Sequence, residues 1–579
     1  MPNMIQNAKD SISQILNAAY QKAAEKGELP AGAALSGTVE IPKDSANGDF
    51  AANHAMAGAK ALHMAPRKIA EALIANADLA DTWFASVEVA GPGFINFRLA
   101  DRWYADVLKA VTQEGSDYGR SDIGHGQKVM VEFVSANPTG PMHMVNARGG
   151  VLGDALASVL DRAGYQVWRE FYVNDAGNQI EKFANSIDAR YQQLLLGEDQ
   201  VAFPEDGYHG DDIKDLAQLF YEANGDRYLT VPVAERHQAM AEFGLQRNIP
   251  KMQEDLRRYG IVYDQWFFES ELHESGYVAE SVQKLTDRGY TYEKDGALWL
   301  KTSQILTEQL RKAGKKQEEI DKLDLKDDVL RRANGFYTYF AADIAYHRNK
   351  LEKRGFDKVI NVWGADHHGH VARLKGAMDA LGLDGEHRLD IVLMQLVKLT
   401  RNGEVVRMSK RTGKAISLTD LLDEIPVDAA RYFFNSRPES PVEFDLELAI
   451  RQDSENPVYY VQYAHARICT LLSALAAEGH TVPASADAAL LSTAEEKELI
   501  KQLAALPEEI RLAARDYDPS RINRYVTELA ARFHRFYTVC RIKGAESDVQ
   551  AARLLLADCV RRVIAVSLGI IGVTAPEKM

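Results

Sequence analysis

The sequence predicts an α/β protein with three main parts: a small α+β domain, a domain built on a parallel sheet, and a C-terminal α-helical bundle. The chain has 579 residues, which is too long for a single hydrophobic core. From Lys128 onward, apolar strand patterns alternate with helical patterns, an order typical of parallel sheets. From about residue 456 to the end, the pattern is helical alone.

Residues 1–118 are expected to form the α+β domain. Apolar residues at helical spacing open the chain, and a second helix is predicted to run from Ala55 to Leu73. The stretch SVEVAGPGFINFRL alternates apolar and polar residues and predicts two strands that turn at the Gly-Pro-Gly of residues 91–93. The polar, glycine-rich stretch EGSDYGRSDIGHGQ is expected to be a linker.

Residues 119–425 are expected to form the parallel-sheet domain. KVMVEFVS is a nearly continuous apolar strand of the buried type, and QVWREFYV is the next strand. A helix between them ends near Gly164, so the three elements make a βαβ unit. Ligands of such sheets bind beyond the carboxyl ends of the strands, where the loop 134–146 is expected.

The rest of the chain divides by composition. Residues of about 180–330 are charged and helix-rich and are expected to be an insertion. Strand patterns return at DKVINVWGADHHGHV and LDIVLMQLVKLT, which are predicted to complete the sheet. A connecting stem is expected at 426–455 and the helical domain at 456–579.

Composition limits the class of protein. The chain is 46% hydrophobic and 26% charged, without an apolar run of the roughly 20 residues that span a membrane and without a signal-peptide core. Its three scattered cysteines give neither a disulfide framework nor a zinc spacing, so we expect a cytoplasmic protein. The net charge of −15 argues against non-specific coating of nucleic acid but not against one specific RNA partner.

Two loops carry residues suited to phosphate chemistry. In ANPTGPMH, the bend at Pro138, Gly140 and Pro141 directs His143 and backbone N–H groups to a helix start, where phosphate binds well. A plain strand-to-helix turn is the alternative. In VVRMSKRTGK, Lys410 and its basic neighbours suit pyrophosphate, and a solvated basic turn is the alternative.

Together these loops resemble the two signature sequences of class I aminoacyl-tRNA synthetases. Further segments are similar to one family in that class, the arginyl-tRNA synthetases: VEFVSANPTGPMH, YVNDAGNQI, DIAYHRNK, WGADHHGHVARLK, DAARYFF with FDLELA, and GVTAPEKM. GDFAANHAM and GPGFINFRL resemble the extra N-terminal domain of that family. The resemblance covers essentially the whole chain in order.

The resemblance implies a Rossmann-type catalytic domain that activates L-arginine with ATP and Mg2+ and transfers it to the terminal adenosine of tRNA(Arg). It also implies a tRNA-contacting N-terminal domain, an anticodon-binding helical domain, and a monomer. The catalytic residues that it implies are His143, Asn146 and Lys410. The ATP-binding residues that it implies are Pro138, Thr139, Gly140, His143, Asn146, Gly364, Asp366, Met408, Ser409 and Lys410.

Arginine needs a site of its own, because its guanidinium is planar and permanently charged and pairs best with a carboxylate. Tyr339 and Asp343 lie four residues apart and share one face of a predicted helix, although an aspartate there could also be a solvated charge. The resemblance implies that these two bind the guanidinium. It implies that the rest of the substrate meets Glu132, Ser135, Asn137 and His367.

The sequence GADHHGH could be taken for a metal site, but adjacent histidines on a strand end point apart and no complementary Cys or Glu cluster accompanies them. We therefore expect no metal held by the protein itself. The C-terminal region interleaves aromatic and basic residues, as proteins that read unpaired RNA bases do, although helix bundles also bury tyrosines. The tRNA-binding candidates there are Tyr459, Tyr463, Arg524, Arg532 and Tyr537.

Two positions depart from the family's first signature. Val145 stands where the family has glycine, and Asn146 stands where it has a second histidine. These departures leave open a catalytically weak paralogue that binds tRNA or arginine without joining them. A synthetase of the same class for another amino acid, such as cysteine, fits poorly, because the cysteine enzyme needs a zinc site.

Overall fold

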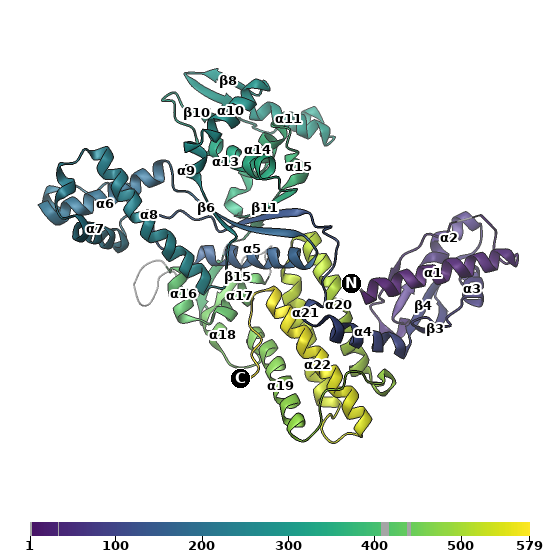
Figure 1. Cartoon of the computed structure of the whole chain (residues 1–579). Coiled ribbons are helices and arrows are strands. Elements are labelled where there is room, and N and C mark those ends of the chain that lie inside the picture. Colours follow the sequence, from purple (N-terminus) through teal and green to yellow (C-terminus); the bar gives the residue numbers. More distant parts are fainter. Residues whose placement is uncertain (1–2, 33, 396, 407–415, 437–441) are drawn as a thin grey trace.

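The computed structural model describes residues 3–32, 34–395, 397–406, 416–436 and 442–579. Figure 1 shows a central parallel sheet with helices above and below it, a helical bundle beneath, and the N-terminal domain projecting to one side. In the described part of the chain, no helix is both long and apolar enough to cross a membrane.

The N-terminal domain packs helices on a four-stranded antiparallel sheet of order β1-β2-β4-β3. The turn predicted at residues 91–93 joins β3 to β4, as expected. The helix predicted from Ala55 to Leu73 is instead two helices, because His63 ends the first in a left-handed conformation and Pro66 starts the second. The elements are α1 Met4–Glu25, β1 Val39–Glu40, β2 Phe50–Ala52, α2 His54–Leu62, α3 Pro66–Asn76, β3 Phe84–Ala90, β4 Phe94–Leu99 and α4 Asp101–Glu114.

The central sheet has five parallel strands in the order β12-β11-β5-β6-β7. They are β5 Lys128–Phe133, β6 Gln166–Val173, β7 Gln265–Phe268, β11 Lys358–Gly364 and β12 Leu389–Met394. The predicted βαβ unit is confirmed, with α5 Val145–Arg162 between β5 and β6. The sheet lies in an α/β domain, as predicted.

Alternate residues of β5 face different layers. Val129, Val131 and Phe133 belong to the hydrophobic cluster that includes α5, on one face of the sheet. Met130 belongs instead to the cluster with α13 Tyr339–Arg348 and α14 His368–Ala380, on the other face. By the same alternation, Glu132 faces the α13 side, and its carboxylate is bonded there.

The region of about 180–330 is not one helical insertion. α6 Asn178–Leu196, α7 Asp211–Asn224 and α8 Val233–Arg258 form one helical group, and the chain then returns to the central sheet as β7. A second group follows on the other side of the sheet, as Figure 1 shows. It contains α9 Glu269–Glu274, α10 Tyr277–Asp287, α11 Thr302–Lys312, α12 Gln317–Ile320 and an antiparallel sheet of β8 Thr291–Lys294, β9 Ala297–Leu300 and β10 Asp328–Arg331.

The stretch LDIVLMQLVKLT does not enter the central sheet as a whole. Its first half is β12, after the short helix α15 Gly385–Arg388, but its second half is β13 Val397–Arg401 in a separate three-stranded sheet. There β13 pairs with β14 Glu404–Val405 and, in parallel, with β15 Val442–Asp445, which falls in the expected stem. The stem region also contains α17 Val427–Asn435 and α18 Leu446–Ile450, and α16 Leu418–Glu424 precedes it.

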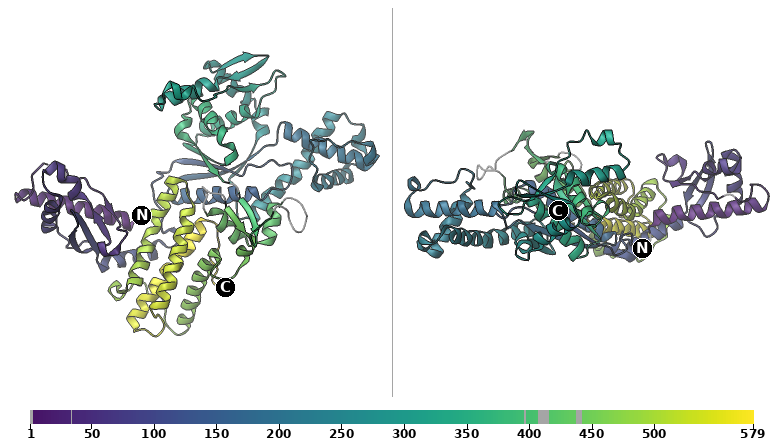
Figure 2. Two further views of the ribbon diagram at one scale, coloured as in Figure 1. Left: turned by 180° about the vertical axis from the view of Figure 1, so that it is seen from behind. Right: turned by 90° about the horizontal axis from the view of Figure 1, so that it is seen from above.

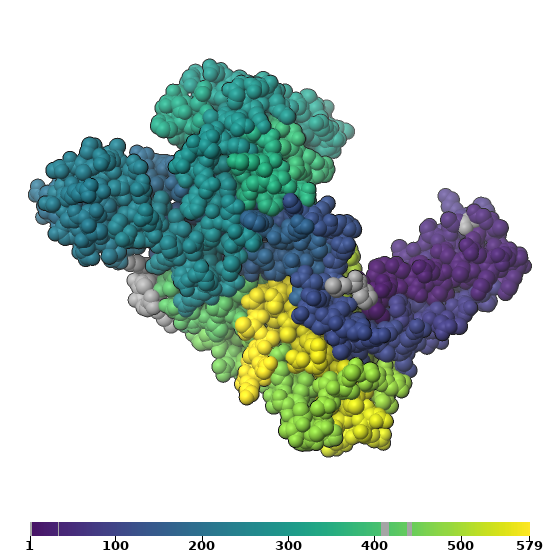
Figure 3. Space-filling view, viewed as in Figure 1, coloured from purple at the N-terminus to yellow at the C-terminus, as the bar shows by residue number. Residues whose placement is uncertain are grey.

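Four long helices complete the chain: α19 Pro457–Ala477, α20 Ala494–Asp516, α21 Ser520–Val539 and α22 Ser547–Ile570. The view from behind in Figure 2 shows them directly below the central domain. The expected linker is packed against them, because Tyr118 is buried and its hydroxyl donates to the Leu503 carbonyl at 3.0 Å. Figure 3 shows the rest of the N-terminal domain standing clear of the central domain across a wide notch.

Candidate active site

A cavity of about 590 Å³ lies beyond the carboxyl ends of the central strands. This is the edge of the sheet where the sequence predicts the ligand site. Seven of the predicted site residues line it: Glu132, Ser135, Asn146, Asp343, Gly364, Asp366 and His367. Further lining residues, which the sequence did not single out as site residues, include Val134, Arg148, Tyr172, Asn174, Trp363, His370 and Gln395.

The chain leaves β5 in an unusual conformation. Val134 and Ser135 have φ values of 71° and 46°, in the left-handed region that costs a non-glycine residue roughly 1 to 3 kcal/mol. Side-chain contacts fix the turn. The Ser135 hydroxyl donates to Oε1 of Glu132 at 2.9 Å and accepts the backbone N–H of Tyr172 at 3.2 Å. The strained turn therefore holds a hydroxyl and a carboxylate together at the cavity wall.

The next part of the loop supports the site from outside the cavity. Pro138 and Thr139 are buried, and the Asn248 side chain of α8 donates to the Pro138 carbonyl at 2.9 Å. Gly140 lies against Asp212 of α7, whose carboxylate oxygen is 3.2 Å from the position of an added Cβ. Asn137, in contrast, is exposed. These four predicted site residues are not among those that line the cavity.

The first signature loop contacts the segment that follows the second loop, residues 416–418, through its backbone. The Met144 N–H donates to the Ile416 carbonyl at 3.1 Å, and the Leu418 N–H donates to the Met142 carbonyl at 2.8 Å. His143, which is exposed, thus lies opposite Ser417 in a short antiparallel bridge. The predicted residues Met408, Ser409 and Lys410 lie outside the described residues, a few positions before this bridge.

The helix α5 starts at the cavity. Its N-terminal cap residue, Met144, offers no side-chain hydrogen bond to the helix, and Val145 and Asn146 in the first turn both line the cavity. A helix N-terminus attracts anions because its first N–H groups lack partners within the helix. Here the Asn146 and Ala147 N–H groups donate to the carbonyls of His143 and Met144 at 3.0 and 2.9 Å, so the helix dipole is the main attraction that this end offers an anion. His143 is not among the residues that line the cavity.

Asp343 projects from α13 into the cavity. Its Oδ2 accepts a hydrogen bond of 2.8 Å from Nε2 of His370, and Arg373 donates to the other ring nitrogen at 3.1 Å. Burial disfavours the carboxylate, but the His370 hydrogen bond and the nearby His347 and Lys350 outweigh it and hold the pKa of Asp343 below its ordinary value. Asp343 is therefore an ionised carboxylate suited to a cationic ligand.

Tyr339 lines a different cavity, also of about 590 Å³, together with Gly177, Glu181, Glu269 and Phe336. The structure thus separates Tyr339 and Asp343, although they lie about one turn apart on α13. Tyr172 joins the two cavities, because it lines the first and is hydrogen-bonded to Glu269, which lines the second. Glu269 is 3% exposed and escaped prediction because it follows the short strand β7 inside the expected insertion.

The end of β11 contributes Gly364, Asp366 and His367. The side chains of Asp366 and His367 are 77% and 60% exposed, so both reach solvent at the cavity mouth. Within the described ranges, no cluster of His, Cys, Asp and Glu is arranged to hold a metal ion. The last histidine of the motif, His370, points to Asp343 instead.

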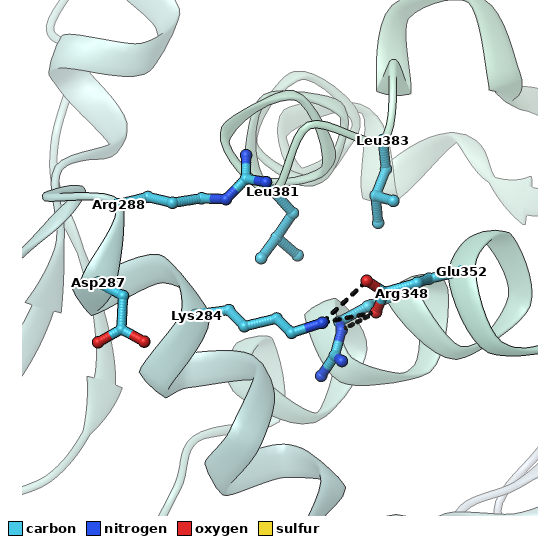
Figure 4. A pocket seen from close by; sticks show the side chains of 7 residues that line it. All are labelled: Lys284, Asp287, Arg288, Arg348, Glu352, Leu381 and Leu383. Atoms are coloured by element: carbon cyan, nitrogen blue, oxygen red, sulfur yellow. Dashed lines mark hydrogen bonds and ion pairs between the residues drawn. The ribbon is translucent and has the colours of Figure 1, made fainter.

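A smaller hollow lies between α10 and the end of α14 (Figure 4). Lys284 and Arg348 extend to the same carboxylate, Glu352, with a Lys284 Nζ to Oε1 distance of 2.8 Å. The Asp287 carboxylate is turned away from this group in Figure 4. Because these two cations are paired by carboxylates of the protein, we assign this hollow no ligand.

The aromatic residues predicted to read RNA form one group on α19 and α21. Tyr459 and Tyr463 stack with ring centroids 6.1 Å apart, and the Arg467 guanidinium lies 4.1 Å from the centre of the Tyr537 ring. Tyr463 is 40% exposed, so its ring is open to solvent.

The two predicted arginines differ from this aromatic group. The Arg524 side chain is 57% exposed and paired with Asp518. Arg532 is bonded to Glu498 and Glu528 and lines a cavity against the N-terminal domain. Its guanidinium is therefore already engaged by two carboxylates of the protein.

Three family profiles together match most of the chain. The profile of the "Arginyl tRNA synthetase N terminal domain" family matches residues 6–99, that of "tRNA synthetases class I (R), catalytic domain" matches 107–442, and that of the "DALR anticodon binding domain" matches 461–579. Two curated relatives named Arginine--tRNA ligase match all of this chain and all of their own length. One, from Acetivibrio thermocellus, is 52% identical, and the other, from Caldanaerobacter subterraneus subsp. tengcongensis, is 54% identical.

Among solved structures, the Thermus thermophilus arginyl-tRNA synthetase has the same fold. It superposes with a TM-score of 0.72 at 20% identity, over 99% of this chain and 100% of that one. From the catalytic-domain match and the full-length relatives, it follows that the chain belongs to the arginyl-tRNA synthetase family of class I aminoacyl-tRNA synthetases.

Proposed function

We propose that this chain is an arginine–tRNA ligase that activates L-arginine with ATP and transfers it to the terminal adenosine of tRNA(Arg). The observation that carries this proposal within the site is the pair of carboxylates Glu132 and Asp343 in one cavity beside the N-terminus of α5. L-arginine brings two cationic groups and one carboxylate. The two cations match the two carboxylates, and the substrate carboxylate is left to react with ATP.

For arginine, Asp343 holds the guanidinium and Glu132 with Ser135 holds the α-amino end. Asp343 is the ionised carboxylate on α13, and charge-assisted hydrogen bonds from a guanidinium to a carboxylate are among the stronger ones in proteins. His367 lies at the mouth of the same cavity. Tyr339 and Asn137 do not line this cavity, so their proposed contacts to arginine require the side chains to turn toward it.

For ATP, His143 and Asn146 bind the phosphates at the start of α5, and Gly364 and Asp366 hold the ribose. Pro138, Thr139 and Gly140 shape the loop, and Met408, Ser409 and Lys410 complete the nucleotide site from the second loop. Mg2+ enters with the nucleotide and offsets phosphate charge. On either side of His143, the first loop bonds to residues 416–418, which directly follow the second loop, and this supports the action of both loops on one nucleotide.

The chemistry has two steps. An oxygen of the arginine carboxylate attacks the α-phosphorus of ATP. The bond between the α-phosphorus and the oxygen that bridges to the β-phosphorus breaks, and pyrophosphate leaves. A hydroxyl of the terminal adenosine then attacks the arginyl carbonyl, and AMP leaves with the bonding electron pair. The protein acts mainly through positioning and through the side chains of Lys410 and His143, which stabilise the charge on the phosphates.

For tRNA, we propose that unpaired bases stack on Tyr459, Tyr463 and Tyr537. The exposed Tyr463 ring and the guanidinium of Arg467 over Tyr537 support this surface. Arg524 adds a phosphate contact at the edge of the bundle. Arg532 would have to exchange a carboxylate of the protein for RNA, so its contribution is proposed to be the smaller of the two.

An arginine-dependent exchange between ATP and pyrophosphate tests the proposal, with and without tRNA(Arg). We expect exchange in at least one of these conditions. Absence of exchange in both would favour the catalytically weak paralogue. Asp343→Asn should raise the arginine KM by roughly 10- to 100-fold, the worth of one hydrogen bond between charged groups, and leave the ATP KM nearly unchanged.

The effect of Val145 on ATP binding distinguishes an active ligase from a catalytically weak paralogue. It is 46% exposed and lines the cavity at the first turn of α5, where a glycine would leave bare backbone for the adenine. We expect Val145→Gly to lower the ATP KM without changing the arginine KM. An unchanged ATP KM would show that this side chain does not limit nucleotide binding.

A further inference from the structure

A lysine with no role in the proposed chemistry is buried behind the arginine site. Lys350 lies in a π-helical turn, Asn349–Lys353, that continues α13, and it is 0% exposed. Such turns are frequent at functional sites. Its ammonium donates to Oε2 of Glu132 at 2.5 Å and to Oδ1 of Asn361 at 3.3 Å, and it lies 4.0 Å from the centre of the Tyr346 ring.

These contacts belong to a longer chain of hydrogen bonds with a fixed direction. Lys350 can only donate, so the Asn361 oxygen faces it and the Asn361 amide nitrogen faces Nε2 of His347 at 2.7 Å. Nε2 must then accept, so the His347 proton lies on Nδ1, which donates to the Asp343 carbonyl at 2.8 Å. Burial, followed by the charge of Lys350, lowers the pKa of His347 to about 3, in agreement with a neutral ring.

The chain therefore links the backbone of Asp343 to the carboxylate of Glu132. It starts at the backbone of Asp343 and ends at Glu132, whose other oxygen accepts from Ser135. We infer that Lys350 is a positioning residue for arginine: its ammonium fixes one oxygen of Glu132, so that the other oxygen, which also accepts from Ser135, faces the α-ammonium of the substrate. This inference rests on the proposed function, because it assigns the α-amino end of arginine to Glu132.

Charge in this part of the site supports the assignment. With Lys350 present, Glu132 and Asp343 together with the lysine carry a net charge of about −1, which complements the net +1 of L-arginine at neutral pH. Glu170, the next carboxylate, is paired with Arg354. The remaining titratable groups that face Glu132 are neutral, since burial holds the pKa values of Tyr172, Tyr263 and Tyr346 well above the ordinary value.

Removal of the lysine charge should change the ionisation of Glu132. Without the lysine, Glu132 keeps the Ser135 hydroxyl as a donor but loses its cation, and burial then favours the protonated form of the carboxyl group. The α-ammonium of arginine would then meet a neutral carboxyl group at low pH and a carboxylate at higher pH. A residue that merely fills space would not produce this pH dependence.

The experiment compares Lys350→Met with a matched control, Lys358→Met. Lys358 is also paired with a carboxylate, Asp390 at 2.6 Å, but it lies at the start of β11, outside the cavity. In the exchange assay, Lys350→Met should raise the arginine KM roughly tenfold or more near pH 6 and recover part of that loss by about pH 8. The ATP KM should change little, and Lys358→Met should behave as the wild type.

A second variant guards against misfolding. Lys350→Gln keeps a polar N–H donor on a slightly shorter side chain and removes the charge, so it should show the same recovery with pH. Adding Glu132→Gln to Lys350→Met should abolish the recovery, because no carboxylate then remains to titrate. The inference would be overturned if Lys350→Met and Lys350→Gln both had the arginine KM of the wild type. It would also be overturned if both raised the arginine KM equally at every pH. Lack of exchange in the wild type would instead overturn the proposed function.

Discussion

The contact between α5 and β5 predicts that a substitution at Gly153 will destabilise the protein. Gly153 of α5 packs directly on Phe133, the last residue of β5. A Cβ added at Gly153 would lie 2.1 Å from Cγ of Phe133, where ordinary contact begins at 3.4 Å. In Gly153→Ala, the Phe133 ring or the helix must therefore move by roughly 1 Å.

Helix propensity and overpacking have opposite effects on the free energy of unfolding of Gly153→Ala. Alanine is favoured over glycine in a helix interior by up to about 1 kcal/mol. Overpacking a filled core costs typically about 1 to 3 kcal/mol. Phe133 is 1% exposed and its ring centroid is 4.7 Å from that of Tyr263, so it has little room to retreat. We expect Gly153→Ala to destabilise the protein by roughly 1 to 2 kcal/mol.

The same substitution should also reach the arginine site. The Phe133 carbonyl accepts the Ser135 N–H at 3.1 Å and the Tyr263 hydroxyl at 3.0 Å, so a shift of Phe133 moves the strained turn that holds Ser135. We therefore expect a raised arginine KM in Gly153→Ala. Calorimetric melting and the exchange assay measure the two effects.

Gly569→Ala is the matched control. This glycine is also helical, in the last turn of α22, but it is exposed and an added Cβ would meet no atom within 4 Å. Helix propensity alone then predicts an unchanged or slightly raised melting temperature. The reasoning is refuted if Gly153→Ala melts as high as Gly569→Ala and binds arginine as the wild type does.

Three further predictions concern stability and reactivity. Arg431, which is 0% exposed, donates to Asp154 at 2.5 Å and to the Ile571 carbonyl at 3.2 Å, so Arg431→Met should cost roughly 3 kcal/mol and lower the melting temperature. The pKa of His347 is lowered to about 3, so between about pH 6.5 and 3 the unfolded state binds one proton more than the folded state, and stability should fall as the pH falls through this range. In His347→Gln the fall should be less steep, by up to about 1.4 kcal/mol per pH unit, which melting temperatures measured over an acid titration will show. Burial raises the pKa of Cys559 to about 12, so at pH of about 8 a thiol reagent should label the half-buried Cys469 first and Cys559 only on unfolding, which peptide mass mapping will test.

The parts of the fold that could be predicted from sequence are those with strong local patterns. β6 begins and ends where the apolar run QVWREFYV does, and the loop before α5 contains the expected bend. β7 was missed because four residues, QWFF, are too short to show a period and stand among helices. What makes them a strand is pairing with β6, a contact that no local pattern encodes.

The candidate site shows the same limit. Glu132 and Asp343 were placed through family resemblance, and the structure brings both into one cavity. Lys350 could not be singled out, because a lysine on a helix is by default a solvated charge and its partner lies 218 positions away. Helical spacing grouped Tyr339 with Asp343, but the elements packed around α13 divide its surface between two cavities.

The contact between the N-terminal region and the C-terminal bundle has a consequence for biosynthesis. Tyr118 and Leu503 are separated by 385 positions, yet the tyrosine is buried against the helix that carries the leucine. At a translation rate of about 5 to 20 residues per second, roughly 20 to 80 s pass before that helix leaves the ribosome. During this time the surface around Tyr118 lacks its partner in α20, so the nascent chain exposes an apolar surface near its beginning. A chaperone on the ribosome would find this exposed surface well before the catalytic domain is complete.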